Sequence, residues 1–268
     1  MNQPGPGASS AELKACCAQL YASDVARLLL GDSLHPGGTA TTSRLAALLA
    51  LDSSRTVLDV ACGRGASAIH LARTVGCRVV GTDLSAENVE AAVAAAHDAD
   101  VADLCTFTAG DAESLSAEDA AFDAVICECA FCTFPDKPAA AAEFARVLRP
   151  GGGVGVADIT RDGPAHRDLD GLLAWVACIA DARTIDGYST LLAEAGLHIE
   201  HIEKHDEALL SLIDRVRARL VVGRVLGAAR PEAIAGWDID RAQELASAAL
   251  AAVHEGTLGY AIITARRQ

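Results

Sequence analysis

The sequence predicts an α/β fold, with a mostly parallel sheet, helices on both faces, an N-terminal helical lid and a helical insertion near the C-terminus. Three observations predict it. Short apolar runs alternate with helical segments from Thr56 to Asp158, a glycine-rich turn follows the first run, and a last apolar run follows two long helical segments. Alternating strands and helices favour a parallel sheet. Ligands in such sheets bind at the carboxyl ends of the strands.

The 268 residues divide by composition into a short lead-in and one domain. Residues 1–10 are rich in Pro, Gly and Ser, which predicts a disordered lead-in. Residues 11–268 are expected to form a single domain. Its parts are a helical lid at 11–52, a ligand-binding core at 53–160 and a substrate-side tail at 161–268 that completes the sheet.

Each element has a local signal. Ser10 is a plausible N-cap for the first helix, and Ser85 for the helix after the second strand. The expected strands are 57–61, 78–83, 106–109, 122–127, 153–158, 198–202 and 258–265. The expected helices are 11–30, 42–51, 66–76, 85–99, 137–148, 187–195, 208–226 and 241–255. The last strand is expected to pair antiparallel with the strand that precedes the two long helices.

Composition and charge exclude several classes of protein. The formal net charge is −14 and dense Lys/Arg runs are absent, whereas binding a phosphate backbone needs a basic footprint, so nucleic acid is not an expected partner. No uninterrupted apolar stretch reaches the roughly 20 residues of a membrane span. Without a secretion signal, we expect a cytoplasmic protein whose nine cysteines stay reduced.

Acidic residues at three strand ends indicate a nucleotide-type cofactor. Asp59 precedes a turn containing Gly63 and Gly65, where the missing Cβ lets the backbone approach a ligand. Asp83 ends the second strand, where ribose hydroxyls would lie. These features also fit NAD enzymes. Two observations favour S-adenosylmethionine over NAD. The carboxylate of Asp59 suits a cationic amino-acid group, and Asp111, after the third strand, suits the adenine amino group.

Together, these motifs resemble the class I S-adenosylmethionine-dependent methyltransferases over residues 56–158, with 146–152 similar to that family's helix and turn after the fourth strand. The resemblance implies a Rossmann-like sheet with S-adenosyl-L-methionine as cofactor. It departs where Ala66 and Ser67 follow Gly65 in place of a third glycine, but both residues are small. The implied cofactor-binding residues are Asp59, Ala61, Gly63, Gly65, Asp83, Leu84, Asp111, Ala112 and Cys127.

An unusual cysteine-rich segment follows the fourth strand, where this fold places the methyl acceptor. Cys127, Cys129 and Cys132 fall within six residues, which packing alone explains poorly. If the strand includes Cys127, the period of two puts Cys127 and Cys129 on one side.

Residues 122–160 resemble arsenite methyltransferases, with Cys129 at the position of that family's arsenic-binding cysteine. A second segment places Cys178 at the partner cysteine, although Ala177 and Asp181 depart from the pattern. The resemblance implies catalysis by Cys129 and Cys178, soft thiolates that would hold trivalent arsenic without any need for a base. Cys132, Cys17 and Cys16 are further candidate metalloid ligands. Neighbouring helical residues point about 100° apart, so one of Cys16 and Cys17 is expected to face the site.

Two alternatives remain open. In the first, the protein is a small-molecule O-, N- or C-methyltransferase of specialised metabolism, and the cysteines take no part in the reaction. In the second, it is a thiol-based metal or redox sensor built on a degenerate methyltransferase fold. The expected partners are a small-molecule or metalloid substrate and a thiol reductant, with no membrane.

Overall fold

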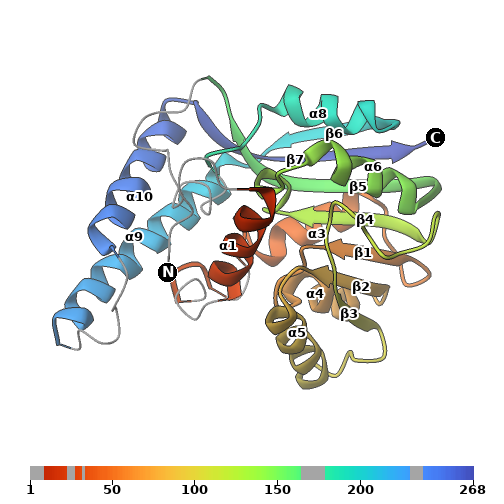
Figure 1. The fold of residues 1–268 in the computed structure, drawn as a ribbon, viewed down its shortest axis with the longest axis horizontal. Coiled ribbons are helices and arrows are strands. Elements are labelled where there is room, and N and C mark those ends of the chain that lie inside the picture. The colour runs from red at the N-terminus through yellow and green to blue at the C-terminus, as the bar shows by residue number, and fades with distance from the viewer. Residues whose placement is uncertain (1–8, 23–27, 32–33, 164–178, 230–237) are drawn as a thin grey trace.

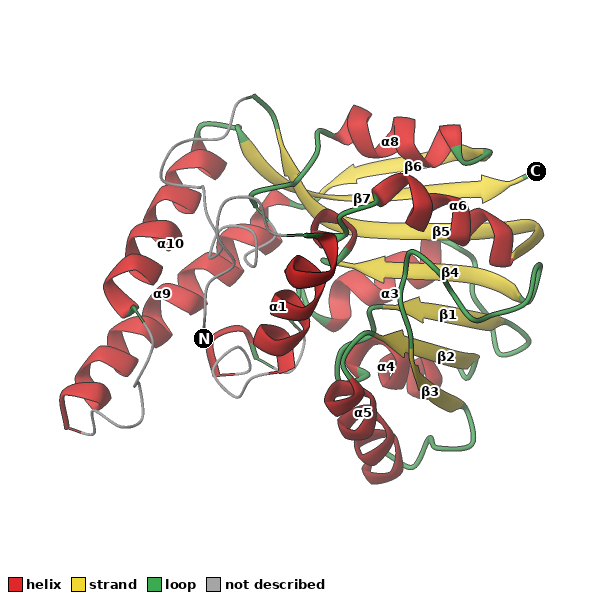
Figure 2. Ribbon diagram, in the orientation of Figure 1, coloured by secondary structure: helices red, strands yellow, loops and turns green. Residues whose placement is uncertain are grey.

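The computed structural model describes residues 9–22, 28–31, 34–163, 179–229 and 238–268. A seven-stranded sheet in the order β3-β2-β1-β4-β5-β7-β6 runs through this part of the chain (Figures 1 and 2). The strands are β1 (Thr56–Val60), β2 (Arg78–Asp83), β3 (Cys105–Ala109), β4 (Phe122–Glu128), β5 (Leu148–Arg161), β6 (Leu197–Lys204) and β7 (Leu258–Arg267). The first five are parallel, and β7 runs antiparallel to both β5 and β6. The predicted sheet and its antiparallel closing strand are therefore confirmed.

Helices cover both faces of the sheet. The helices that the structure describes in full are α1 (Ser10–Ala22), α3 (Thr39–Leu48), α4 (Ala66–Thr74), α5 (Ala86–Asp98), α6 (Lys137–Val147), α8 (Ile185–Glu194), α9 (Asp206–Ala229) and α10 (Ile239–His254). One buried cluster joins α4 and α5 to β1, β2 and β3, and a larger one joins α6, α8 and α10 to β4, β5 and β7. None of the described helices combines the length and apolar character that crossing a bilayer requires.

Side-chain caps fix where several helices begin. Ser85 accepts a hydrogen bond from the Asn88 N–H at the start of α5, as predicted, and Asp136 accepts from Ala139 at the start of α6. Such caps satisfy N–H groups that have no partner within the helix. Most predicted boundaries agree with the structure to within three residues.

One predicted boundary needs correction. The first helix was expected over residues 11–30; α1 covers Ser10–Ala22, residues 28–30 are also helical, and residues 23–27 lie outside the described part of the chain. The fifth strand was expected to start at residue 153, yet β5 begins at Leu148. Leu148 pairs with Phe122, and Gly153 pairs with Ala124. The register shift between these two pairs accommodates the glycine-rich residues 149–152.

The strand register brings the candidate site together. Val60 pairs with Thr82 on one side and with Cys127 on the other. The residues that follow (Ala61, Asp83 and Glu128) therefore lie at one edge of the sheet. The arrowheads of β1 and β4 point towards α1, which lies across this edge, whereas α9 and α10 pack on each other and extend away from the sheet (Figure 1).

Candidate active site

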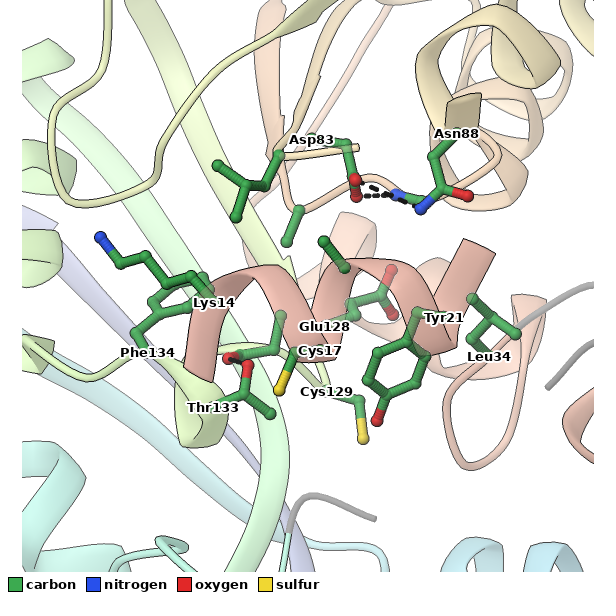
Figure 3. Close-up of a pocket in the computed structure, with 15 residues that line it drawn as sticks. Lys14, Cys17, Tyr21, Leu34, Asp83, Asn88, Glu128, Cys129, Thr133 and Phe134 are labelled. Carbon is green, nitrogen blue, oxygen red and sulfur yellow. Dashed lines mark hydrogen bonds between the residues drawn. The ribbon is translucent and has the colours of Figure 1, made fainter. Parts of the chain in front are cut away.

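A cavity of about 700 Å³ lies between α1 and the carboxyl edge of the sheet (Figure 3). This volume includes the part of the cavity that is open to solvent. Its walls come from α1, the glycine turn after β1, the end of β2 and the segment after β4. The lining residues are Lys14, Cys17, Ala18, Tyr21, Leu34, Ala61, Gly63, Asp83, Leu84, Asn88, Glu128, Cys129, Ala130, Thr133 and Phe134.

Asp83 is the centre of a hydrogen-bonded cluster at one end of this cavity. Its carboxylate accepts from the Gly63 N–H at 2.8 Å, the Ser85 N–H at 2.9 Å and the Asn88 amide nitrogen at 3.2 Å. The amide oxygen of Asn88 is buried and has no partner. Asp83 thus ties the glycine turn to α5, and Asn88 presents an acceptor to a hydroxyl-bearing ligand.

A smaller adjoining pocket of about 370 Å³ is lined by Asp59, Glu128, His35, Arg64 and Ser67, among others. One oxygen of the buried Asp59 carboxylate, Oδ2, lacks a hydrogen-bond partner. Burial, followed by the charges of Glu128 and Asp83, raises the pKa of Asp59 well above its ordinary value. A buried carboxyl with an unused oxygen favours a positively charged donor, so the pocket fits the ammonium group of an amino acid.

The turn between β1 and α4 needs glycine for steric reasons. Gly65 has φ 81°, and a Cβ there would lie 2.9 Å from the ring of Phe107 and 3.0 Å from Ala92. Ala61 also has a positive φ of 57°. Cys62 is buried and donates weakly to the Gly63 carbonyl at 3.7 Å, as expected of a residue that packs beside the cofactor. The absent third glycine does not distort the turn, because Ala66 already begins α4.

A buried polar network surrounds Glu128. Thr42 on α3 donates its hydroxyl to the Glu128 carboxylate at 3.0 Å and contacts the Ser67 hydroxyl at 3.3 Å. Ser67 in turn lies 3.3 Å from His35 Nε2, and His35 Nδ1 lies 3.7 Å from Glu128. Glu128 is the carboxylate that lines both pockets, so this network fixes a negative charge where they meet.

Asp111 and Ala112, which were predicted to contact the adenine, follow β3, and neither lines the two pockets. Asp111 accepts from the Glu113 N–H at 3.0 Å and from Lys14 Nζ at 2.7 Å. Lys14 also pairs with Glu113. These contacts join α1 to the segment after β3, while Leu84 at the end of β2 lines the main cavity.

The opposite end of the cavity is mostly apolar. Tyr21, Ala130 and Phe134 line it, with Thr133 and two thiols as additional polar groups. Figure 3 shows Cys17 and Cys129 projecting near Tyr21 from two segments far apart in sequence. Cys129 has φ 53°, a left-handed conformation rare for a non-glycine residue, and its N–H donates to the Ala157 carbonyl at 2.7 Å.

The remaining predicted thiols lie elsewhere. Cys127 is fully buried inside β4, and its pKa is raised well above the ordinary thiol value by burial, then by the charges of Asp158 and Asp59. It does not line either cavity. The expected shared side for Cys127 and Cys129 was wrong, because β4 ends at Glu128 and the positive φ of Cys129 breaks the alternation.

Cys132 lies in a short 3₁₀ turn, η1 (Phe131–Thr133), where its N–H donates to the buried Asp158. Its side chain belongs to the larger buried cluster. Cys17 lines the cavity whereas Cys16 does not, as the helical spacing predicts. Burial raises the pKa of Cys16. Cys178 lies outside the described residues, among which no three His, Cys, Asp or Glu side chains form a metal-binding group.

Sequence reasoning missed several residues that line the cavity. Lys14, Asn88 and Glu128 were not predicted. Glu128 lies one position past the end of the predicted strand 122–127, and Asp83 was predicted from a similar position at a strand end. At Glu128 the prediction was based instead on the neighbouring cysteines. Lys14 has no such signal, because its partners are about a hundred residues away in sequence.

Comparisons with known proteins agree on one family. A model described as a methyltransferase domain matches residues 57–152. The methyltransferase GfsG of Streptomyces halstedii is 32% identical over 63% of this chain, a match that spans only 62% of that protein. The 27-O-demethylrifamycin SV methyltransferase of Amycolatopsis mediterranei is 33% identical over 67% of this chain and 72% of its own length. An arsenite methyltransferase of Halobacterium salinarum is 31% identical over 60% of this chain, but only 42% of that protein is matched.

Solved structures show the same fold over nearly the whole chain. Geranyl diphosphate C-methyltransferase from Streptomyces coelicolor, in complex with S-adenosyl-L-homocysteine, has a TM-score of 0.75 at 18% identity, covering 99% of this chain and 100% of that one. The [4+2]-cyclase SpnF has a TM-score of 0.79 at 23% identity, covering 100% and 99%. Because one of the two is a cyclase, the shared fold alone does not define a reaction.

Proposed function

Because this chain belongs to the class I S-adenosylmethionine-dependent methyltransferases, we propose that it methylates a hydroxyl group of a small, largely apolar organic acceptor. The predicted class and cofactor are confirmed. The arsenite enzyme is one of several kinds of relative and is not singled out among them. The observation that carries the proposal is the continuous cavity, which has polar, charged walls at its cofactor end and apolar, aromatic walls at the other. The relative named for 27-O-demethylrifamycin SV as its substrate supports it.

The residues present fit S-adenosylmethionine. The unpaired Asp59 oxygen would hold the methionine ammonium, and Asp83 and Asn88 the ribose hydroxyls. Asp111 and Ala112, which follow β3 outside the two pockets, remain the residues proposed for the adenine. When bound, the cofactor supplies an electrophilic methyl group on a sulfonium. The chain positions the acceptor against it and excludes water, which is the main work in a transfer of this kind.

The acceptor hydroxyl must also lose a proton. Of the two carboxylates on the main cavity wall, Asp83 is already engaged by three donors. Glu128 accepts from the Thr42 hydroxyl, and His35 Nδ1 lies 3.7 Å from it. We assign proton removal to the Glu128 carboxylate, with Thr42 holding its orientation. Tyr21 and Thr133 would orient the hydroxyl from the opposite wall.

Methyl-labelled S-adenosylmethionine tests the proposal with a panel of hydroxylated, largely apolar organic molecules, 27-O-demethylrifamycin SV among them, beside simple amines and thiols. Label transferred to a hydroxyl, and lost in Glu128→Gln while that variant still binds S-adenosylhomocysteine, would support it. Label found only on nitrogen, carbon or sulfur acceptors would overturn it. Glu118→Gln, an exposed residue of the same chain, is the matched control.

One specific observation favours a second candidate, methyl transfer to a thiol-bound soft acceptor such as trivalent arsenic. Cys17 and Cys129 line the same cavity from α1 and from the segment after β4. Two thiolates at this position are suitable ligands for such an element. Methylated arsenic formed from arsenite by the reduced protein, and absent in Cys129→Ser with Cys178→Ser, would establish this function. A wild-type protein that binds the cofactor but does not methylate arsenite would exclude it.

A further inference from the structure

Glu113 links three segments of the chain next to the cavity. It lies on the segment after β3, between the adenine side and β4. One of its oxygens, Oε2, pairs with Lys14 on α1. The other, Oε1, accepts the backbone N–H of Asp136 at 2.7 Å, at the start of α6. A single carboxylate therefore connects the lid helix, the cofactor side and the end of the segment that carries Phe134.

Lys14 reinforces this junction. Its ammonium also lies 2.7 Å from Asp111 Oδ2, so one cation bridges two carboxylates. The side chains of Lys14 and Glu113 are only 19% and 12% exposed, which limits screening by solvent. Partly buried, charge-assisted hydrogen bonds of this kind are stronger than surface ion pairs.

The position of α1 makes these ion pairs relevant to cofactor binding. Lys14, Cys17 and Tyr21 on this helix form one wall of the cavity, opposite Asp83 (Figure 3). A cofactor seated against Asp83 and Asp111 is covered by the helix. We therefore expect α1 to move away from that wall when the cofactor enters and leaves.

We propose that the Lys14–Glu113–Asp111 cluster is a latch that holds α1 closed over the cofactor and sets the rate of cofactor exchange. Because Glu113 also holds Asp136, opening the latch loosens the acceptor wall together with the lid. Lys14 and Glu113 are positioning residues, and neither is assigned a contact with the methyl group. The inference does not depend on the identity of the acceptor.

Stopped-flow binding of S-adenosylhomocysteine to the full chain tests the latch. In Lys14→Met we expect both the association and the dissociation rate constants to rise about tenfold, with the dissociation constant changed by less than about threefold, because a latch alters the barrier more than the end states. Glu113→Gln should act in the same direction. Lys14→Arg, which keeps the cation, should restore the slow exchange.

Salt provides a second readout. Ionic screening weakens the ion pairs, so raising ionic strength should accelerate exchange in the wild type and have little effect in Lys14→Met. Lys204→Met and Glu118→Gln change exposed charges of the same types and are the matched controls. Thermal unfolding of each variant establishes that it is folded.

Two results would overturn the proposal. Exchange rates in Lys14→Met and Glu113→Gln within twofold of wild type would show that these ion pairs do not hold the lid. Weaker binding with an unchanged association rate would show instead that Lys14 and Glu113 contact the cofactor directly.

Discussion

The two ends of the cavity are built in different ways. At the cofactor end, Asp83 receives three hydrogen bonds, two of them from backbone N–H groups of adjacent turns. At the acceptor end, the wall comes from α1 and from the segment after β4, and its central residue, Cys129, has a left-handed backbone. The cofactor end is thus fixed by neighbouring strand ends, and the acceptor end by segments that meet only in the folded chain.

This difference separates binding from specificity. Backbone N–H groups hold the Asp83 side chain at the cofactor end, whereas the acceptor end is lined by side chains of α1 and of the segment after β4. Substitutions at the first end should change cofactor affinity for any acceptor, and substitutions at the second should change which acceptor is used. The following variants test that division, beginning with the largest expected effect.

Asp59→Asn should weaken S-adenosylhomocysteine binding about 100-fold, because a hydrogen bond between charged partners contributes roughly 1.5–3 kcal/mol. Isothermal titration calorimetry measures the change. Asp103→Asn, at an exposed position after α5, is the control and should bind as wild type does. Unchanged affinity in Asp59→Asn would place the ammonium group elsewhere.

The same variant should be more stable without cofactor. The folded pKa of Asp59 is raised, so ionisation is harder in the folded than in the unfolded state. This penalty is absent at low pH, where the carboxyl is neutral in both states, and grows as pH rises above the unfolded value near 4. The gain in the free energy of unfolding of Asp59→Asn should therefore appear only above that pH and increase with it, as urea titrations at several pH values would show. A gain independent of pH would contradict the ionisation argument.

Gly65→Ala should lower the free energy of unfolding by about 2 kcal/mol, because the new Cβ meets Phe107 at a positive φ. Gly223→Ala is the matched control, since Gly223 lies within α9 and a Cβ there meets nothing within 4 Å. That control should gain roughly 0.5–1 kcal/mol. Chemical denaturation measures the free energy of unfolding of both variants. Equal changes at the two positions would contradict the steric argument for Gly65.

Phe134→Ala should raise the acceptor KM about tenfold, as expected for losing part of an aromatic contact surface. Cofactor affinity should stay within about twofold of wild type. Leu84→Ala should show the opposite pattern, since Leu84 lies beside Asp83. Steady-state kinetics and cofactor titrations together test the division, and a loss of cofactor affinity in Phe134→Ala would break it.

Cys129→Ser should have the smallest effect, less than about twofold on methylation of an organic hydroxyl, because the substitution is nearly isosteric and a bystander thiol does no chemistry. The reaction rate with a saturating acceptor is the measurement. A loss of tenfold or more would instead favour the thiol-bound acceptor.

The sequence predicted the cofactor end in some detail. Asp59, Gly63, Asp83 and Asp111 each stand at a fixed distance from a strand end, and parallel strands carry such residues to one edge. The acceptor end was less accessible to this reasoning. The side-chain period of two in a strand predicted that Cys127 and Cys129 lie on the same side. However, β4 ends at Glu128, one residue before Cys129.

Long-range pairing explains what else was missed. The Lys14 side chain meets Asp111 across 97 positions in sequence, and Thr42 meets Glu128 across 86. Neither pair leaves a periodic or spacing signal, because each member satisfies the local pattern of its own element. Only the crossing of α1 and α3 over the sheet edge brings them together.

The order of β6 and β7 has a consequence for how the chain is made. Among the described strands β6 hydrogen-bonds only to β7, which comes after α9 and α10 in the chain. A nascent polypeptide that ends before β7 has β1 to β5 available for pairing but leaves β6 without a neighbour. Native docking of β6 therefore waits for translation to pass α10, and a pause at that point would expose an unpaired strand to ribosome-associated chaperones.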